Sequence, residues 1–180
     1  MSIFSFLGKR RGDSPQGAPA VAEGRDNEIV YPTKALTKFL SVLAAREKPV
    51  LLDLGPVVGS NVNFFGEQLG CKIRVEDIFA DLERHSANNA MDKLPAFFAS
   101  RFTQAPGSVH GILAWDVLDF LDKHSAQALA TAVMKLMAPD AALLGFFNNA
   151  TQEPATQVYT KYVVVDQGTC LLYTSDAADD

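Results

Sequence analysis

The sequence predicts an α/β fold, a mainly parallel sheet with helices on both faces. Short apolar runs of the kind that form buried parallel strands recur along the chain. Segments with the 3.6-residue spacing of amphipathic helices alternate with these runs. A polar residue follows several of the runs directly, and in open α/β sheets ligands gather where the strands end. The 180 residues, of which 48% are hydrophobic, are enough for one domain with one core.

The first strand and its loop are the clearest pattern in the chain. Residues 50–52 are a compact apolar run between a proline and a glycine, which predicts a short strand buried on both faces. Asp53 breaks this run at the expected carboxyl end of the strand. Gly55 and Gly59 then bracket a loop tight enough to favour glycine at both positions.

A helix and a second strand are expected after the loop. Ser60 or Asn61 can cap the helix, and Gly70 is a natural end for it. The strand at residues 72–75 is followed by Glu76, about 20 residues beyond the first loop glycine, where an acid holds a ribose in dinucleotide-binding units. Strand, glycine loop, helix and acid together predict a nucleoside-binding site.

Predicted strands and helices continue to alternate along the remaining chain, except in one segment that lacks a clear strand pattern. Between residues 90 and 107 the apolar residues show no period of two, so a strand there is expected to be short or absent. The run that ends near residue 114 is followed by Trp115, expected to be a buried or rim aromatic, and by Asp116. Further strands are expected at residues 110–114, 141–147 and 159–165, and further helices near residues 31–46, 78–86 and 125–138.

Both ends of the chain differ from this central part. Residues 1–27 are rich in glycine, proline, alanine and charge and predict a disordered N-terminal arm. The apolar residues of the arm are too few to span a bilayer and precede its basic residues, so we expect no membrane span and a cytoplasmic location. Residues 170–180, CLLYTSDAADD, resemble a translated sequencing adapter. The resemblance implies a non-native tail that packs against nothing specific and a domain, residues 28–169, that is incomplete at its C-terminus.

The net charge and the histidine and cysteine content give no support for nucleic-acid binding, a metal site or a disulfide framework. The formal net charge of −5 gives no bulk-charge signal for nucleic-acid binding. The three histidines lack the spacing of metal ligands, so no metal site is expected. Outside the tail the chain has one cysteine, Cys71, which fits a reducing compartment and excludes an internal disulfide framework. No feature predicts an oligomeric state.

The segments VLLDLGPVVGSN, VED and GILAWDVLDFL, in this order, resemble the class I S-adenosylmethionine-dependent methyltransferase family over about residues 32–147. The resemblance implies a Rossmann-like fold and S-adenosylmethionine as cofactor. It places Asp53 near the methionine amino group, Gly55 and Gly59 at the outer positions of the cofactor loop, and Glu76 on the ribose hydroxyls. Asp116 closes the fourth strand of the family's sheet and completes the expected cofactor-binding set.

Methyl transfer to an acceptor, expected to be a small molecule, is the function that the resemblance implies. The reaction depends mainly on positioning, so no catalytic residue and no particular acceptor follow from the cofactor loop. Val57 stands where the family has its middle loop glycine. A loop that still holds cofactor would therefore need Val57 at negative φ, with its side chain packed toward apolar neighbours.

Two alternatives remain open. Val57 favours a methyltransferase-like domain that has lost activity and serves as a binding or regulatory module. A nicotinamide-dependent oxidoreductase is less well supported, because its fingerprint is G-x-G-x-x-G without an aspartate two residues before the first glycine. This chain has Asp53 and the spacing G-x-x-x-G.

Overall fold

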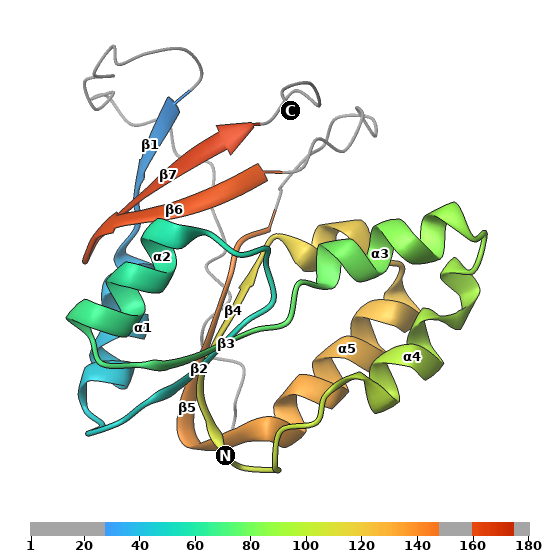
Figure 1. Cartoon of the computed structure of the whole chain (residues 1–180), viewed down its shortest axis with the longest axis horizontal. Coiled ribbons are helices and arrows are strands. Elements are labelled where there is room, and N and C mark those ends of the chain that lie inside the picture. The colour runs from blue at the N-terminus through green and yellow to red at the C-terminus, as the bar shows by residue number, and fades with distance from the viewer. Residues whose placement is uncertain (1–27, 148–159, 175–180) are drawn as a thin grey trace, which may run out of the picture.

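The computed structural model describes residues 28–147 and 160–174, and its centre is a parallel sheet flanked by helices (Figure 1). The strand order is β3-β2-β4-β5, and all three neighbouring pairs are parallel, which confirms the predicted α/β class. The strands are β2 (Val50–Asp53), β3 (Lys72–Val75), β4 (Val109–Trp115) and β5 (Met137–Gly145). The expected N-terminal arm lies outside the described residues.

The helices cover both faces of this sheet. One face carries α1 (Lys34–Ala44), α2 (Gly59–Asn63) and the π-helical turn η1 (Phe64–Gln68), and the other carries α3 (Ile78–Ala87), α4 (Leu94–Arg101) and α5 (Lys123–Leu136), as Figure 1 shows. Two short 3₁₀ turns, η2 (Met91–Lys93) and η3 (Val117–Phe120), join elements. None of the described helices is long and apolar enough to cross a membrane.

The parallel sheet lies between two hydrophobic cores, and successive side chains of its central strands enter one core and then the other. Leu51 and Leu113 are buried with the apolar stripe of α1. Leu52 and Ile112, their neighbours in sequence, are buried with α3, α4 and α5. Because successive strand residues point to opposite faces, a short run such as 50–52 supplies both cores.

The helix after the glycine loop differs in detail from the prediction. It begins at Gly59 after the extended residue Val58, and neither Ser60 nor Asn61 caps it. The π-helical turn that follows adds a residue to one turn and changes which positions face inward. As a result Phe64 and Phe65, although adjacent, are both buried.

The segment without period-two alternation contains no strand in the structure. Residues 91–101 form η2 and α4, and α4 packs against α5. The next helix, α5, ends at Leu136, three residues before the expected stop at Pro139. Pro139 lies instead within β5, an edge strand of the sheet, where the missing N–H of proline is tolerated.

A second, antiparallel sheet was not anticipated. Its strands are β1 (Glu28–Pro32), β6 (Thr160–Asp166) and β7 (Thr169–Thr174), in the order β1-β7-β6. We expected residues 31–33 to open a helix, but they continue or follow β1, because β1 pairs with a strand more than a hundred residues away. Only the strand at residues 159–165 was predicted, within a residue of β6.

The prediction that residues 170–180 pack against nothing specific is wrong for the part that the structure describes. Residues 170–174 belong to β7, the central strand of the second sheet, and Cys170 is fully buried in the core beneath α1. Residues 175–180 lie outside the described residues. The resemblance to an adapter stays a prediction about the origin of these codons.

Removing β7 tests whether the second sheet depends on it. A chain ending at Thr169 should lose at least about 2 kcal/mol of unfolding free energy, because β1 and β6 both lose their partner and the buried side chain of Cys170 is removed. Urea titration followed by circular dichroism measures the difference. A chain ending at Thr174 keeps β7 whole and is the control. Equal stability of the two chains would contradict a structural role for this strand.

Candidate functional site

The parallel register brings the predicted site residues to one edge of the sheet. Asp53 is paired with Val75 of β3 and with Leu113 of β4, so the carboxyl ends of the three parallel strands lie at the same edge of the sheet. The Glu76 N–H donates to the carbonyl oxygen of Asp53 at 2.7 Å, which fixes the two strand ends side by side. The predicted clustering of Gly55, Glu76 and Asp116 at the carboxyl edge is therefore confirmed.

Asp53 is a buried carboxylate with two donors from its own chain. Its side chain is 4% exposed, and Oδ1 accepts hydrogen bonds from the Gly55 N–H at 2.9 Å and from the Trp115 indole N–H at 2.7 Å. Burial raises the pKa of Asp53 to about 6; the two hydrogen bonds oppose this shift and the nearby charge of Asp77 adds to it.

Trp115 fills the space next to the first loop glycine. A Cβ atom built on Gly55 would lie 2.6 Å from Cδ1 of the indole, so this position accepts no side chain. Trp115 itself has φ 47°, in the left-handed region that a bulky residue rarely adopts. The close approach to Gly55 that the family resemblance assigns to a cofactor is thus made by a side chain of the protein.

The loop positions Gly59 and Val57 have more space around them than Gly55. A Cβ atom on Gly59 would meet nothing within 4 Å. Val57 is not among the described non-glycine residues with positive φ, in agreement with the expected negative φ. Its side chain is 67% exposed, however, so the packing against apolar neighbours that a cofactor-holding loop would need is not found.

Three aromatic rings stack at this edge. Tyr162 of β6 lies nearly parallel to Trp115, with an interplanar angle of 7° and centroids 5.3 Å apart, and to Phe146, with 15° and 5.0 Å. Trp115 and Phe146 are 6.2 Å apart at 22°. Trp115 ends β4 and Phe146 follows β5, so the stack joins the carboxyl ends of two parallel strands to the second sheet.

Asp116 completes this cluster through a hydrogen bond with the Tyr162 hydroxyl. The hydroxyl donates to Oδ2 of Asp116 at 3.1 Å, whereas Oδ1 is buried without a hydrogen-bond partner in the described structure. Asp116 is 8% exposed, and burial raises its pKa to about 6. Burial, followed by the charge of Asp116, also raises the pKa of Tyr162.

Asn61 holds β6 over the edge. Its Nδ2 donates to the carbonyl oxygen of Tyr162 at 2.9 Å, and its Oδ1 accepts from the Val164 N–H at 2.8 Å. The amide therefore bonds to the strand as a neighbouring strand would. The turn after β6 is also anchored, since Gly168 accepts from the Thr33 N–H at 2.7 Å and Gln167 accepts from the Thr37 hydroxyl at 2.9 Å.

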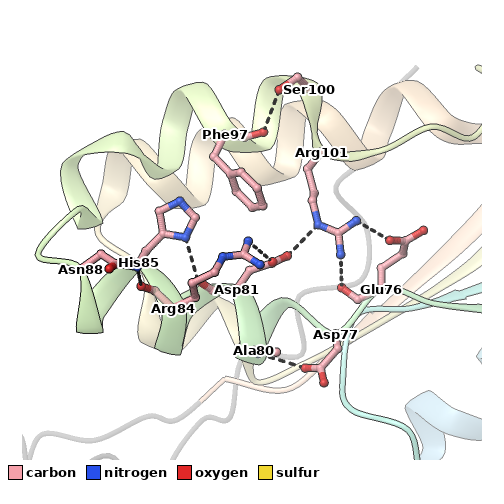
Figure 2. Close-up of polar contacts among 10 residues, drawn as sticks. All are labelled: Glu76, Asp77, Ala80, Asp81, Arg84, His85, Asn88, Phe97, Ser100 and Arg101. Carbon is pink, nitrogen blue, oxygen red and sulfur yellow. Dashed lines mark hydrogen bonds and ion pairs between the residues drawn. The ribbon is translucent and has the colours of Figure 1, made fainter.

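Glu76 is engaged by residues of α4 and of the loop that follows, as Figure 2 shows for Arg101. Oε2 pairs with Arg101 at 2.5 Å, and Oε1 accepts from Gln104. Arg101 also pairs with Asp81 of α3 at 2.7 Å. Burial alone would lower the pKa of Arg101, but its bonds to Asp81 and Glu76 outweigh this and raise it. Arg101 thus links Glu76, at the end of β3, to Asp81 of α3.

Five residues of this edge escaped the sequence prediction. Asn61 lies in α2, directly after the glycine loop, and the other four come from segments more distant in sequence: Arg101, Gln104, Phe146 and Tyr162. One hollow on the described surface lies between α4 and α5 and has Gln104 in its lining, and another lies beside the C-terminal end of α1. Among the described residues no group of histidine, cysteine or acidic side chains could hold a metal ion.

The raised pKa of Asp53 predicts how stability changes with pH. Its value is about 6 in the folded chain against an ordinary 3.8, so the folded state binds a proton more tightly than the unfolded state. Unfolding free energy should therefore fall as pH rises from about 4 to about 6, by up to about 3 kcal/mol for this group. Asp53→Asn keeps an acceptor for Trp115 and should flatten the fall, as measured by urea titrations at several pH values.

Asp116→Asn is the companion variant for this measurement. Asp116 titrates in the same window for the same reason, so its replacement should remove a further part of the slope. An unchanged slope in the Asp53→Asn chain would contradict a proton-binding role for the buried Asp53 carboxyl.

Arg101→Gln should destabilise the chain by about 3 kcal/mol, because it leaves the carboxylates of Glu76 and Asp81 without their shared cation. Arg84→Gln is the matched control. Arg84 pairs with the same Asp81 but its side chain is 58% exposed, so we expect a loss below about 1 kcal/mol. Chemical denaturation of both variants gives the comparison, and similar losses would argue against a central role for Arg101.

Comparisons of the chain with protein-family models, with curated proteins and with solved structures find no match, so what is inferred about its function rests on the geometry of this edge.

Proposed function

We propose that the chain is a methyltransferase-like module that works by binding rather than by methyl transfer. One observation carries the proposal: the three carboxylates expected to hold a cofactor are already bonded within the chain. Asp53 accepts from Trp115, and Glu76 pairs with Arg101. Asp116 accepts from Tyr162 at the same edge.

The contacts that close this edge would oppose cofactor binding. A nucleoside that approached Gly55 would have to displace Trp115 from Asp53 and lift β6, which breaks the Tyr162 hydroxyl bond and both bonds of Asn61. At about 1 kcal/mol net for each hydrogen bond, these contacts alone cost about 4 kcal/mol. Such a cost weakens an apparent dissociation constant by about a thousandfold.

Methyl transfer from S-adenosylmethionine to a small acceptor is the second candidate. The arrangement of Asp53, Gly55, Gly59, Glu76 and Asp116 around the carboxyl edge favours it, because ligands of open α/β sheets bind there. This candidate requires Trp115 and Tyr162 to move before cofactor enters. A cytoplasmic location is part of either proposal.

Titration calorimetry with S-adenosylmethionine separates the two candidates. For a binding module with a closed edge we expect no saturable heat at cofactor concentrations up to about 1 mM, given the thousandfold penalty. Val57→Gly should not change this result, because the Val57 side chain is mostly exposed and does not close the edge.

A dissociation constant near 10 μM or tighter that Glu76→Ala weakens by about 1 to 3 kcal/mol would overturn the proposal in favour of methyl transfer. Near-ultraviolet circular dichroism of each chain shows that the comparison is made between folded proteins.

A further inference from the structure

The ring of Tyr162 stacks on two aromatic rings at the carboxyl edge of the parallel sheet. Trp115 and Phe146 belong to the parallel sheet and its following loop, whereas the Tyr162 ring is brought onto them by the second sheet. Nearly parallel, offset rings about 5 Å apart are the geometry in which proteins hold nucleobases on aromatic side chains. Trp115 and Phe146 therefore form a platform that the chain covers with a ring of its own.

The Asp116 carboxylate determines which hydrogen-bond donors a ring bound on this platform should carry at its edge. Tyr162 supplies a donor to Oδ2 only, and Oδ1 stays buried without a partner. A buried carboxylate with an unpaired oxygen is satisfied best by a group that presents two parallel donors. The N1–H and the exocyclic N2–H of a guanine base are such a pair. An adenine base presents one amino donor beside the lone pair of N1, which a carboxylate repels.

We propose that the platform of Trp115 and Phe146, together with Asp116, binds a free guanine base or nucleoside once the Tyr162 ring has moved away, and that Tyr162 is a built-in competitor for this site. The inference rests on the proposed binding function and names its ligand. The net charge of −5 offers no attraction to the phosphates of a polynucleotide, so the ligand is a free base or nucleoside.

Calorimetry with guanosine on the Tyr162→Ala chain is the test. Removal of the ring opens the platform and frees Oδ2, so guanosine should bind at least tenfold more tightly than to the wild-type chain. Inosine, which lacks the 2-amino group, should bind less tightly than guanosine, and adenosine should bind least. Lys161→Ala alters an exposed neighbour on the same strand and should behave as the wild type.

A second pair of variants tests the role assigned to Asp116. In the Tyr162→Ala background, Asp116→Asn replaces one acceptor with a donor and should abolish the preference for guanosine over adenosine. Tyr162→Phe covers the case in which the alanine chain does not fold, because it keeps the stack and removes only the hydroxyl. It should raise the affinity for guanosine severalfold over the wild type.

The outcomes distinguish this inference from the proposed function. Binding of p-cresol, the analogue of the tyrosine side chain, to the Tyr162→Ala chain reports whether the platform is open. Binding of p-cresol without a preference for guanosine overturns the guanine assignment, and so does an unchanged affinity in the Tyr162→Phe chain. Tighter binding of a guanine-containing oligonucleotide than of guanosine overturns the choice of a free ligand. Tight S-adenosylmethionine binding by the wild type, by contrast, overturns the proposed function whatever guanosine does.

Discussion

The hydrogen bond from the Trp115 indole to the buried carboxylate of Asp53 is the contact on which the carboxyl edge depends. The bond holds the indole over the loop, so Gly55 can carry no side chain. In this position the indole ring also stacks with Tyr162. Through Tyr162 and the two bonds from Asn61, the second sheet is held on the ends of the parallel strands. One positioned aromatic residue therefore connects loop, strands and second sheet.

The parallel sheet could be predicted because each of its strands is encoded locally. A buried strand needs only a short apolar run with a break at each end, and the runs at residues 50–52, 110–114 and 141–147 have this form. Once the strands are parallel, their carboxyl ends must meet at one edge. This is why Asp53, Glu76 and Asp116 could be placed together without knowledge of any side-chain contact.

The contacts of those residues could not be predicted, because their partners are distant in sequence. Nothing near Glu76 indicates that Arg101, 25 positions later in a segment without periodicity, pairs with it. Tyr162 was recognised only as part of a strand, and a period of two does not say which surface the strand covers. The second sheet escaped for the same reason, since β1 has no strand partner near it in sequence and its pairing with β7 spans almost the whole chain.

Several energetic costs are concentrated at this edge. Asp53 and Asp116 are carboxylates whose pKa values burial raises to about 6, so their charged forms are less stable in the folded chain than in water. Trp115 adds a left-handed backbone conformation. The other non-glycine residues with positive φ in the described structure, Asn89 and Asp140, are exposed and of the types that tolerate it. Strain and buried charge of this kind gather where a protein binds or reacts, because packing alone does not require them. These features lower the stability of the fold rather than raise it. The carboxyl edge that they occupy is therefore the place where we look for a binding function.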